Sequence, residues 1–384
     1  MAHDDSSDQV LEVRRASFGE TRLQTMAPGD LGDGQIRLRI DSFAVTANNI
    51  SYAGAGDMLG YWDFFPADDD PQTWGRVPAM GWAEIVESKV ADLPVGGRYY
   101  GWFPMAGSVV FTATATDDGF RDDGAHRQAH APIYRAYLST AVDPWYDASP
   151  DGEDRHAVLR VLFLTGFLAD EFFADCGGTI ADTGGAPYFG AHQVIVLSAS
   201  SKTAIGFAQR AAKREGVSVV GLTSSANVEF VRSLGFYDSV LTYDEIGALA
   251  TVDSVIIDMA GNPTVLAAVH AHLGDRIEYS MMVGKSPHDA VPPADAGGMP
   301  GPAPQFFFAP MDVERRLAAW GPEQYRTNTT SAIAEFIEGS RSWLTIEHRN
   351  GAPDGPNGAV SAWADIHGGN VAPNVGIVTS LPAT

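Results

Sequence analysis

The sequence predicts an α/β protein in which a β-rich region comes first and a doubly wound parallel sheet follows. Two observations carry this prediction. In the first third, apolar and polar residues alternate with a period of two, as at 36–41, where Ile36, Leu38 and Ile40 alternate with charged residues. From residue 192 onward, short continuous apolar runs alternate with helical segments, which is typical of a parallel sheet covered on both faces.

The elements of the β-rich region are short runs separated by glycine, proline and aspartate. Acidic or proline- and glycine-rich stretches at 117–127 and 144–154 predict exposed connections before the pattern changes. The predicted strands, in order, are 11–14, 21–25, 36–41, 82–87 and 98–103.

The second region begins with an apolar stretch at 157–173 whose spacing predicts a helix. The proline-rich stretch 287–304 predicts an irregular loop, 306–309 a last buried strand, and the tail after Gly321 a mixture of helix and strand. The alternating elements between them are predicted strands at 194–197, 217–222, 239–241, 255–257 and 276–283, with helices at 204–214, 228–234 and 264–273.

Length and charge set the class of protein. A chain of 384 residues suggests two domains at ~100–200 residues each. The 48 acidic residues exceed the 25 basic ones, so the net charge is −23, which disfavours nucleic acid and anionic membrane surfaces as partners.

The one cysteine, Cys176, excludes a disulfide framework and a cysteine-cluster zinc site within one chain. His126 and His130 have the spacing of two ligands on a helix, but without a third partner we expect exposed histidines and no metal. The first residues are polar and acidic, unlike a signal peptide, and no apolar stretch reaches the ~20 residues of a membrane helix. We expect a soluble, cytoplasmic protein.

The sharpest local pattern is 194–204, a strand that runs through a turn of small residues into a helix. Such a turn presents backbone N–H groups and a helix N-terminus to an anion. The glycines that usually admit a pyrophosphate are absent, and Ser200, Ser201 and Thr203 supply hydroxyl groups instead. Lys202, one of only four lysines, is expected to contact phosphate there. The alternative is an ordinary helix capped by Ser201.

The next predicted strand ends in a second hydroxyl-rich segment. Thr223 and Ser224 stand where an acidic residue would bind the ribose hydroxyls of NAD, and the first acid is Glu229. Small hydroxyl side chains leave room for a 2′-phosphate and can donate to it. The alternative is a serine-rich helix cap.

Further segments follow one another in a definite order. The strand and turn at 34–51 contain an Asn-x-x-Asp-like turn with Asn48 kept and Ser51 in place of the acid. The other segments are 96–101, 164–168, 231–235 followed by Tyr243, 257–262 and 281–284. This order resembles the zinc-free medium-chain dehydrogenase/reductase superfamily, on the side of the quinone oxidoreductases and enoyl reductases.

The resemblance implies a GroES-like β-rich domain, formed by 1–158 and 322–384, that encloses a Rossmann-like domain at 159–321. It also implies NADP(H) as the cofactor and an active site in the cleft between the domains. Together with the two hydroxyl-rich segments, it gives the candidate cofactor contacts, which are Thr165, Ser200, Ser201, Lys202, Thr203, Thr223, Ser224, Asn227, Tyr243, Gly261, Asn262, Val283 and Gly284.

The expected activity is reduction of an activated C=C or C=O bond in an apolar or aromatic small molecule. In such a reaction the nicotinamide carries the chemistry, and the protein orients it and polarises the acceptor. Tyr52 is the candidate hydrogen-bond donor, and the resemblance places Asn48 near the nicotinamide; packing of Tyr52 and capping by Asn48 are the alternatives. A homodimer is compatible with this fold. The rival function is a non-catalytic binding protein that has lost the dinucleotide. The loop aromatics that are candidates to line a substrate pocket are Tyr61, Trp62, Phe64, Phe65 and Trp74.

Overall fold

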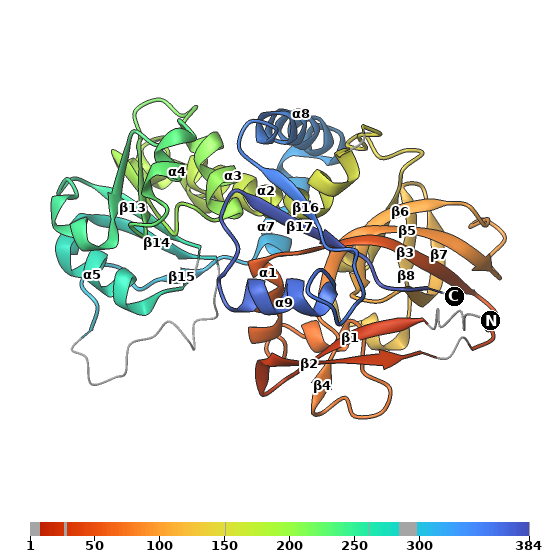
Figure 1. Cartoon of the computed structure of the whole chain (residues 1–384). Helices are drawn as coiled ribbons and strands as arrows, with labels where there is room; N and C mark the ends of the chain where they lie inside the picture. Colours follow the sequence, from red (N-terminus) through yellow and green to blue (C-terminus); the bar gives the residue numbers. More distant parts are fainter. Residues whose placement is uncertain (1–7, 27–28, 150, 260, 284–297, 384) are drawn as a thin grey trace. The chain divides into compact units, whose positions relative to one another are not determined.

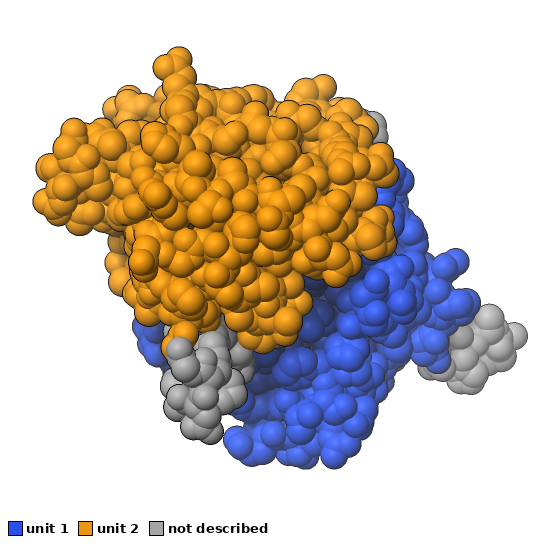
Figure 2. Space-filling model, turned by 90° about the vertical axis from the view of Figure 1, so that its left-hand side faces the viewer, with its two compact units in different colours: residues 1–158, 344–384 blue, residues 159–343 orange. Residues whose placement is uncertain are grey.

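The computed structural model describes residues 8–26, 29–149, 151–259, 261–283 and 298–383. The chain divides into two compact units, Met1–Val158 with Leu344–Thr384 and Leu159–Trp343, which Figure 2 colours separately.

Unit 1 is built on an eight-stranded sheet with the order β16-β17-β3-β5-β6-β9-β8-β7, and β3 pairs with β7 as well as with β5 (Figure 1). The additional pairing gives the sheet a barrel-like, GroES-like form. Its strands are β3 (Gln35–Val45), β5 (Pro78–Ser88), β6 (Arg98–Pro104), β7 (Ser108–Thr116), β8 (Gly119–Asp122), β9 (Ala136–Ser139), β16 (Thr345–His348) and β17 (Val375–Thr379).

A second, three-stranded sheet has the order β2-β1-β4 and contains β1 (Gln9–Arg14), β2 (Ser17–Thr25) and β4 (Trp74–Gly75). Two helices complete the unit, α1 (Ala47–Gly54) and α9 (Ala359–His367). All five strands predicted for this region are present, within longer elements.

The expectation of an exposed connection at 117–127 is wrong. This stretch contains β8, which pairs with both β7 and β9, and it ends at the fully buried Arg127. The Arg127 guanidinium lies 3.9 Å from the centre of the Phe64 ring and 3.4 Å from a carboxylate oxygen of Asp122. A buried charge is tolerated when it is paired, so this polar sequence forms part of the core.

Unit 2 contains a six-stranded parallel sheet with the order β12-β11-β10-β13-β14-β15. Numbered along the chain, this is the 3-2-1-4-5-6 order of a Rossmann fold. The strands are β10 (Gln193–Leu197), β11 (Ser218–Thr223), β12 (Ser239–Thr242), β13 (Ser254–Asp258), β14 (Ile277–Met282) and β15 (Gln305–Phe306).

Helices connect and cover these strands. On one face, Val265, Leu266 and Val269 of α5 pack in one cluster with Leu197 and Ile256. Burial of such apolar side chains is the main force that holds the sheet and its helices together. The helices are α2 (Gly152–Ala174), which begins in unit 1, α3 (Lys202–Ala211), α4 (Val228–Ser233), α5 (Pro263–Leu273), α7 (Ala309–Trp320) and α8 (Pro322–Ser340).

Residues 322–343 were expected in the GroES-like domain, but the structure divides the chain at 343/344 instead. Helix α8 accounts for the difference, since its Phe336 stacks on Phe163 of α2 with ring centres 4.6 Å apart. Lys213, just beyond α3, forms an ion pair with Glu335 of the same helix. Unit 2 is therefore larger than the sequence prediction at its C-terminal end.

The predicted last strand at 306–309 is also shorter than expected. Only Gln305 and Phe306 pair with β14, and Ala309 already begins α7. Pro310 explains the change, because proline has no N–H to lose in the first turn of a helix and its fixed φ suits that position. Of the proline-rich stretch 287–304, only 298–304 lies within the described residues, and it forms no helix or strand.

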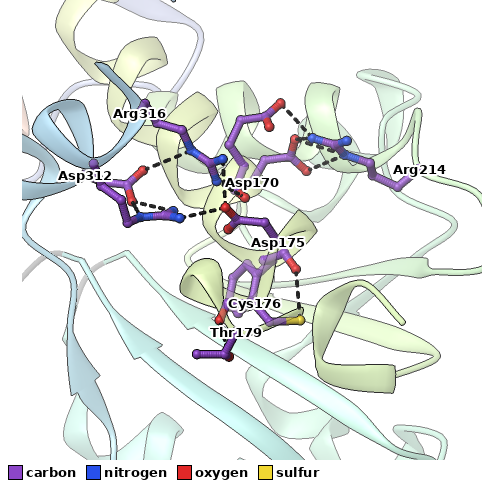
Figure 3. A network of polar contacts seen from close by, with 10 residues as sticks. Asp170, Asp175, Cys176, Thr179, Arg214, Asp312 and Arg316 are labelled. Atoms are coloured by element: carbon purple, nitrogen blue, oxygen red, sulfur yellow. Dashed lines mark hydrogen bonds and ion pairs between the residues drawn. The ribbon is translucent and has the colours of Figure 1, made fainter. Parts of the chain in front are cut away.

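A polar network fastens α7 to the C-terminal end of α2 (Figure 3). Arg315 and Arg316 both bind the Asp175 carboxylate, over 2.6 and 2.9 Å, and Arg316 also donates to the carbonyl oxygen of Glu171. Cations at a helix C-terminus interact favourably with its dipole. On the other side of the network, Arg214 pairs with Asp170.

Candidate cofactor site

The site is located by the sheet itself. Strands β10 and β13 are neighbours, and the order of strands reverses between them, with Leu197 opposite Asp258 at their carboxyl ends. In open parallel sheets, ligands bind at the carboxyl ends of the strands beside such a switch point. The turn at 198–201 and the residues 261–262 lie just beyond these strand ends, so most of the predicted contacts belong to one edge.

The turn after β10 has a defined backbone conformation. Ser198 takes a left-handed conformation, with φ 58°, although it is not a glycine. The Ala199 N–H donates to the Leu222 carbonyl oxygen over 3.0 Å, and Ser201 Oγ accepts from the Ala204 N–H over 3.2 Å. Ser201 is thus the N-cap of α3, as one of the two sequence interpretations expected.

Side chains from the next part of the fold hold this turn. Asn227 donates from Nδ2 to Ser200 Oγ over 3.1 Å, and the hydroxyl oxygens of Ser198 and Tyr243 lie 3.4 Å apart. The Tyr237 hydroxyl donates to the Ala199 carbonyl oxygen over 2.8 Å. The structure therefore brings together the predicted residues Ser200, Asn227 and Tyr243.

Tyr237 is not among the residues predicted from the sequence, although Gly221 carries a signal for it. A Cβ on Gly221 would lie 2.9 Å from the Tyr237 ring and 3.0 Å from the Ala199 Cβ. A glycine inside a strand often marks such a close approach. The absence of a side chain at this position lets the tyrosine reach the turn.

Lys202 is the first residue of α3, beside the capping Ser201. Its side chain is half-buried, and burial lowers the pKa of Lys202 to about 8. Thr203 follows in the same turn and is also half-buried. A desolvated ammonium and a hydroxyl group therefore occupy the first turn of the helix that leaves the switch point.

The predicted role of Thr223 conflicts with its position. Its side chain is 1% exposed, and within the described part of the chain Oγ1 has no hydrogen-bond partner. A hydroxyl group so enclosed cannot contact a bound 2′-phosphate in this conformation. Ser224, the next residue, is half-buried and faces a different environment because side chains alternate at the end of a strand.

At the end of β13, polar side chains form hydrogen bonds with main-chain N–H groups. Asn262 caps α5, since its Oδ1 accepts from the N–H groups of Thr264 and Val265 over 3.1 and 3.3 Å. The buried Asp258, which the sequence analysis gave only a turn or cap role, accepts from Gly261 N–H over 2.9 Å. The Val283 N–H donates to the Asp258 carbonyl oxygen over 2.8 Å. Gly284 lies outside the described residues.

Thr165 lies on α2, where its hydroxyl donates to the Val161 carbonyl oxygen of the preceding turn over 3.0 Å. Its neighbour Gly166 explains how close this helix comes to the cofactor turn. A Cβ on Gly166 would lie 2.8 Å from the Thr203 carbonyl oxygen and 2.6 Å from the Phe207 nitrogen. The main chain of α2 therefore packs directly on the first turn of α3.

The two candidate catalytic residues lie in unit 1, one turn apart on α1, where Asn48 Nδ2 donates to the Tyr52 hydroxyl oxygen. Capping was the alternative role for Asn48, but its neighbour Asn49 has that role instead, because Asn49 Oδ1 accepts from the Thr46 N–H at the start of the helix. Asn49 Nδ2 also donates to the Pro78 carbonyl oxygen. Burial raises the pKa of Tyr52 well above its usual value, so the phenol stays protonated.

The aromatic loop residues pack within unit 1. Tyr61 lies 4.7 Å from Tyr52 between ring centres, and its hydroxyl is 3.0 Å from that of Tyr134. Trp74 is half-buried beneath Arg22. Tyr61, Trp62, Phe64 and Phe65 are all buried. These loop aromatics therefore pack within their own unit.

The histidine pair does not share a helix. His126 is exposed on a short 3-10 turn, Ala125–Arg127, whereas His130 packs on Phe64 and hydrogen-bonds the Gly60 carbonyl oxygen over 3.0 Å. Within the described ranges, no three His, Cys, Asp or Glu side chains are grouped as a metal site would require. Cys176 is buried and accepts from the Phe189 N–H over 3.2 Å.

None of the helices described is both long and apolar enough to cross a membrane. We found no curated protein whose sequence matches this chain.

Solved structures with the same fold cover almost the whole chain. CurA from Vibrio vulnificus in complex with NADPH is 11% identical, with a TM-score of 0.59, over 98% of this chain and 100% of that one. A mutant enoyl thioester reductase from Candida tropicalis is 12% identical, with a TM-score of 0.56, over 97% and 99%. The Etr1p complex with NADP and crotonyl-CoA is 11% identical, with a TM-score of 0.54, over 97% and 99%.

The predicted fold class is thereby confirmed: the chain shares with these structures a two-domain α/β fold, with a GroES-like domain and a Rossmann-like domain. A family profile described as "Protein of unknown function (DUF2855)" matches residues 43–372, which is most of the sequence, and the chain belongs to that family.

Proposed function

We propose that the protein is an NADP(H)-dependent, zinc-independent oxidoreductase that reduces an activated C=C or C=O bond in an apolar or aromatic small molecule. The observation that carries the proposal is the 3-2-1-4-5-6 sheet with a lysine and several hydroxyl groups at its switch point. The similar structures that hold NADPH, or NADP with crotonyl-CoA, support it.

The donor set at the sheet edge fits a dinucleotide phosphate. Ser200, Thr203 and Lys202 offer two hydroxyl groups and an ammonium near the start of α3. At the end of β11, Ser224, Ser225 and Asn227 offer accessible polar side chains, and the first acid, Glu229, is exposed and pairs with Arg232 over 2.9 Å. This arrangement favours a 2′-phosphate over the free ribose hydroxyl of NAD.

When bound, NADPH would supply the hydride, and the protein would supply orientation and a hydrogen-bond donor that polarises the acceptor. Asn48 donates to the phenol oxygen of Tyr52, so the single O–H proton of Tyr52 stays available for an acceptor such as a carbonyl oxygen. The raised pKa of Tyr52 keeps that proton in place at neutral and moderately alkaline pH. Tyr52 is thus proposed as the donor and Asn48 as the residue that positions it.

A non-catalytic binding protein of the same fold is the second candidate. It is favoured by the side chains at 198–204, where a dinucleotide turn usually has glycines, and by the use of the Ala204 N–H within the turn. The side chains leave less room for a pyrophosphate near the backbone, and the bonded Ala204 N–H is not available to it.

Titration of the purified protein with NADPH and then NADH separates the two functions. The oxidoreductase proposal expects enhanced nicotinamide fluorescence and a raised Tm with NADPH, and weaker effects with NADH. If neither nucleotide binds, the oxidoreductase proposal is wrong and the binding-protein alternative stands. Tighter binding of NADH would overturn the choice of cofactor.

A further inference from the structure

The turn after β10 takes a conformation that its sequence does not favour. Ser198 has a φ of 58°, in the left-handed region that glycine adopts freely and that is strained for other residues. The Ser201 N–H donates to the Ser198 carbonyl oxygen over 2.9 Å and closes the turn. Residues in such conformations persist only where the surrounding structure holds them. Groups outside the turn are therefore needed to keep Ser198 in place.

Strand β11 and the chain that follows α4 supply these groups. The Ala199 N–H donates to the Leu222 carbonyl oxygen over 3.0 Å, and the Ala199 carbonyl oxygen accepts from the Tyr237 hydroxyl over 2.8 Å. Both main-chain polar groups of the residue that follows Ser198 are thus bonded to other parts of unit 2. Burial raises the pKa of Tyr237, so the hydroxyl group keeps the proton that it donates.

The Tyr237 hydroxyl also fixes the direction of a main-chain N–H in the turn. The Ala199 carbonyl and the Ser200 N–H belong to one peptide group, and in a trans peptide they point in opposite directions. Because the carbonyl points towards Tyr237, the Ser200 N–H points away from it. Among the described residues, none accepts a hydrogen bond from this N–H, so it is available to an anionic ligand beside the switch point.

Gly221 of β11 makes the tyrosine contact possible. A Cβ on Gly221 would lie 2.9 Å from the Tyr237 ring and 3.0 Å from the Ala199 Cβ, so a larger residue would push the ring away from the turn. Residues 198–204 themselves contain no glycine. The glycine that a dinucleotide turn normally contains is thus replaced by a glycine in the next strand and a tyrosine that packs against it.

We propose that Tyr237 is a positioning residue of the cofactor site, whose hydroxyl group holds the turn at 198–201 in the conformation that receives the pyrophosphate. This inference rests on the proposed function and adds a residue to its site. Tyr237 acts through the peptide group between Ala199 and Ser200, and it does not itself contact the ligand.

A double-mutant cycle tests the proposal. Tyr237→Phe removes only the hydroxyl group, and Ser198→Gly makes the left-handed conformation available without help from outside the turn. Calorimetry measures NADPH affinity for the wild type, each single variant and the double variant. Tyr188→Phe is the matched control, because the Tyr188 hydroxyl donates to the Asp170 carboxylate, a bond in which the turn has no part. Circular dichroism and Tm establish that each variant is folded.

Tyr237→Phe should weaken NADPH binding about threefold to tenfold, as expected for the loss of one hydrogen bond. Ser198→Gly should bind NADPH at least as well as the wild type. In the Ser198→Gly background, Tyr237→Phe should change the affinity by less than about twofold, because the two residues act on the same turn. Tyr188→Phe should lower the Tm and leave NADPH affinity unchanged.

A folded Tyr237→Phe protein with a lower Tm and wild-type NADPH affinity would show a role in stability alone and overturn the inference. An equal loss of affinity in both backgrounds would also overturn it, since Tyr237 would then not act through the conformation of the turn. In both cases the wild type binds NADPH, and the proposed function is intact. A wild type that binds no NADPH would overturn the proposed function, and this inference with it.

Discussion

The side-chain amide of Asn227 donates to the hydroxyl oxygen of Ser200 over 3.1 Å. This bond joins the turn after β10 to the start of α4, which are the two segments that the sequence marks for phosphate binding. The two segments therefore form one continuous polar edge, and a substitution of Asn227 should affect both of them.

Asn227→Asp should shift cofactor preference towards NADH. The new carboxylate keeps the shape of the amide but repels a 2′-phosphate, and an acid near this position can accept from the ribose 2′-hydroxyl group of NAD. We expect NADPH affinity to fall roughly tenfold or more, which is ~1.4 kcal/mol per factor of ten, while NADH affinity is kept or improved. Fluorescence titration with both nucleotides measures the ratio. Asn227→Ala is the control, and an equal effect of both substitutions would contradict this view.

Lys202→Met should stabilise the protein without ligand at neutral pH. The pKa of Lys202 is about 8 in the folded chain against its ordinary value of 10.5, so folding disfavours its protonated form. The resulting destabilisation is present below pH 8 and disappears as the pH rises from 8 through 10.5. Urea unfolding at pH 7 should give a larger free energy of unfolding for the variant than for wild type, and this difference should disappear near pH 10. A difference that does not change with pH would argue against a desolvated ammonium.

Thr223→Val tests whether the buried Thr223 hydroxyl group at the end of β11 contacts the cofactor. The substitution replaces a buried hydroxyl group, which has no partner among the described residues, by a methyl group of similar size. The free energy of unfolding should stay the same or rise by up to ~1 kcal/mol, since an unsatisfied polar atom is removed. NADPH affinity should be unchanged, whereas Ser224→Ala should lower it. Weaker NADPH binding by Thr223→Val would restore Thr223 as a cofactor contact.

Metal removal should have no effect. After extended chelation and dialysis, we expect an unchanged Tm and an unchanged NADPH affinity, because the proposed hydride transfer, with Tyr52 as hydrogen-bond donor to the acceptor, requires no Lewis acid. Elemental analysis of the untreated protein is the companion measurement. A stoichiometric metal whose removal lowers the Tm or the affinity would refute zinc independence.

The sequence was sufficient for the sheet of unit 2, because each buried parallel strand is a short apolar run and each helix has its own period. It was insufficient for the direction of individual side chains. Asn48 and Asn49 are neighbours of the same type, yet one contacts Tyr52 and the other caps the helix. Local pattern also does not say which unit an amphipathic helix joins, and α8 shows this through its stack with α2.

The Gly166 contact has a thermodynamic consequence. Because main chain meets main chain at Gly166, no side chain can lie between α2 and α3 at this contact, and the start of α3 is held firmly in place. A ligand that binds a preorganised surface has little conformational disorder to remove. Calorimetry on NADPH binding should therefore find a small ordering entropy, and a heat-capacity change that reflects the apolar surface covered by the nucleotide, without a contribution from loop folding.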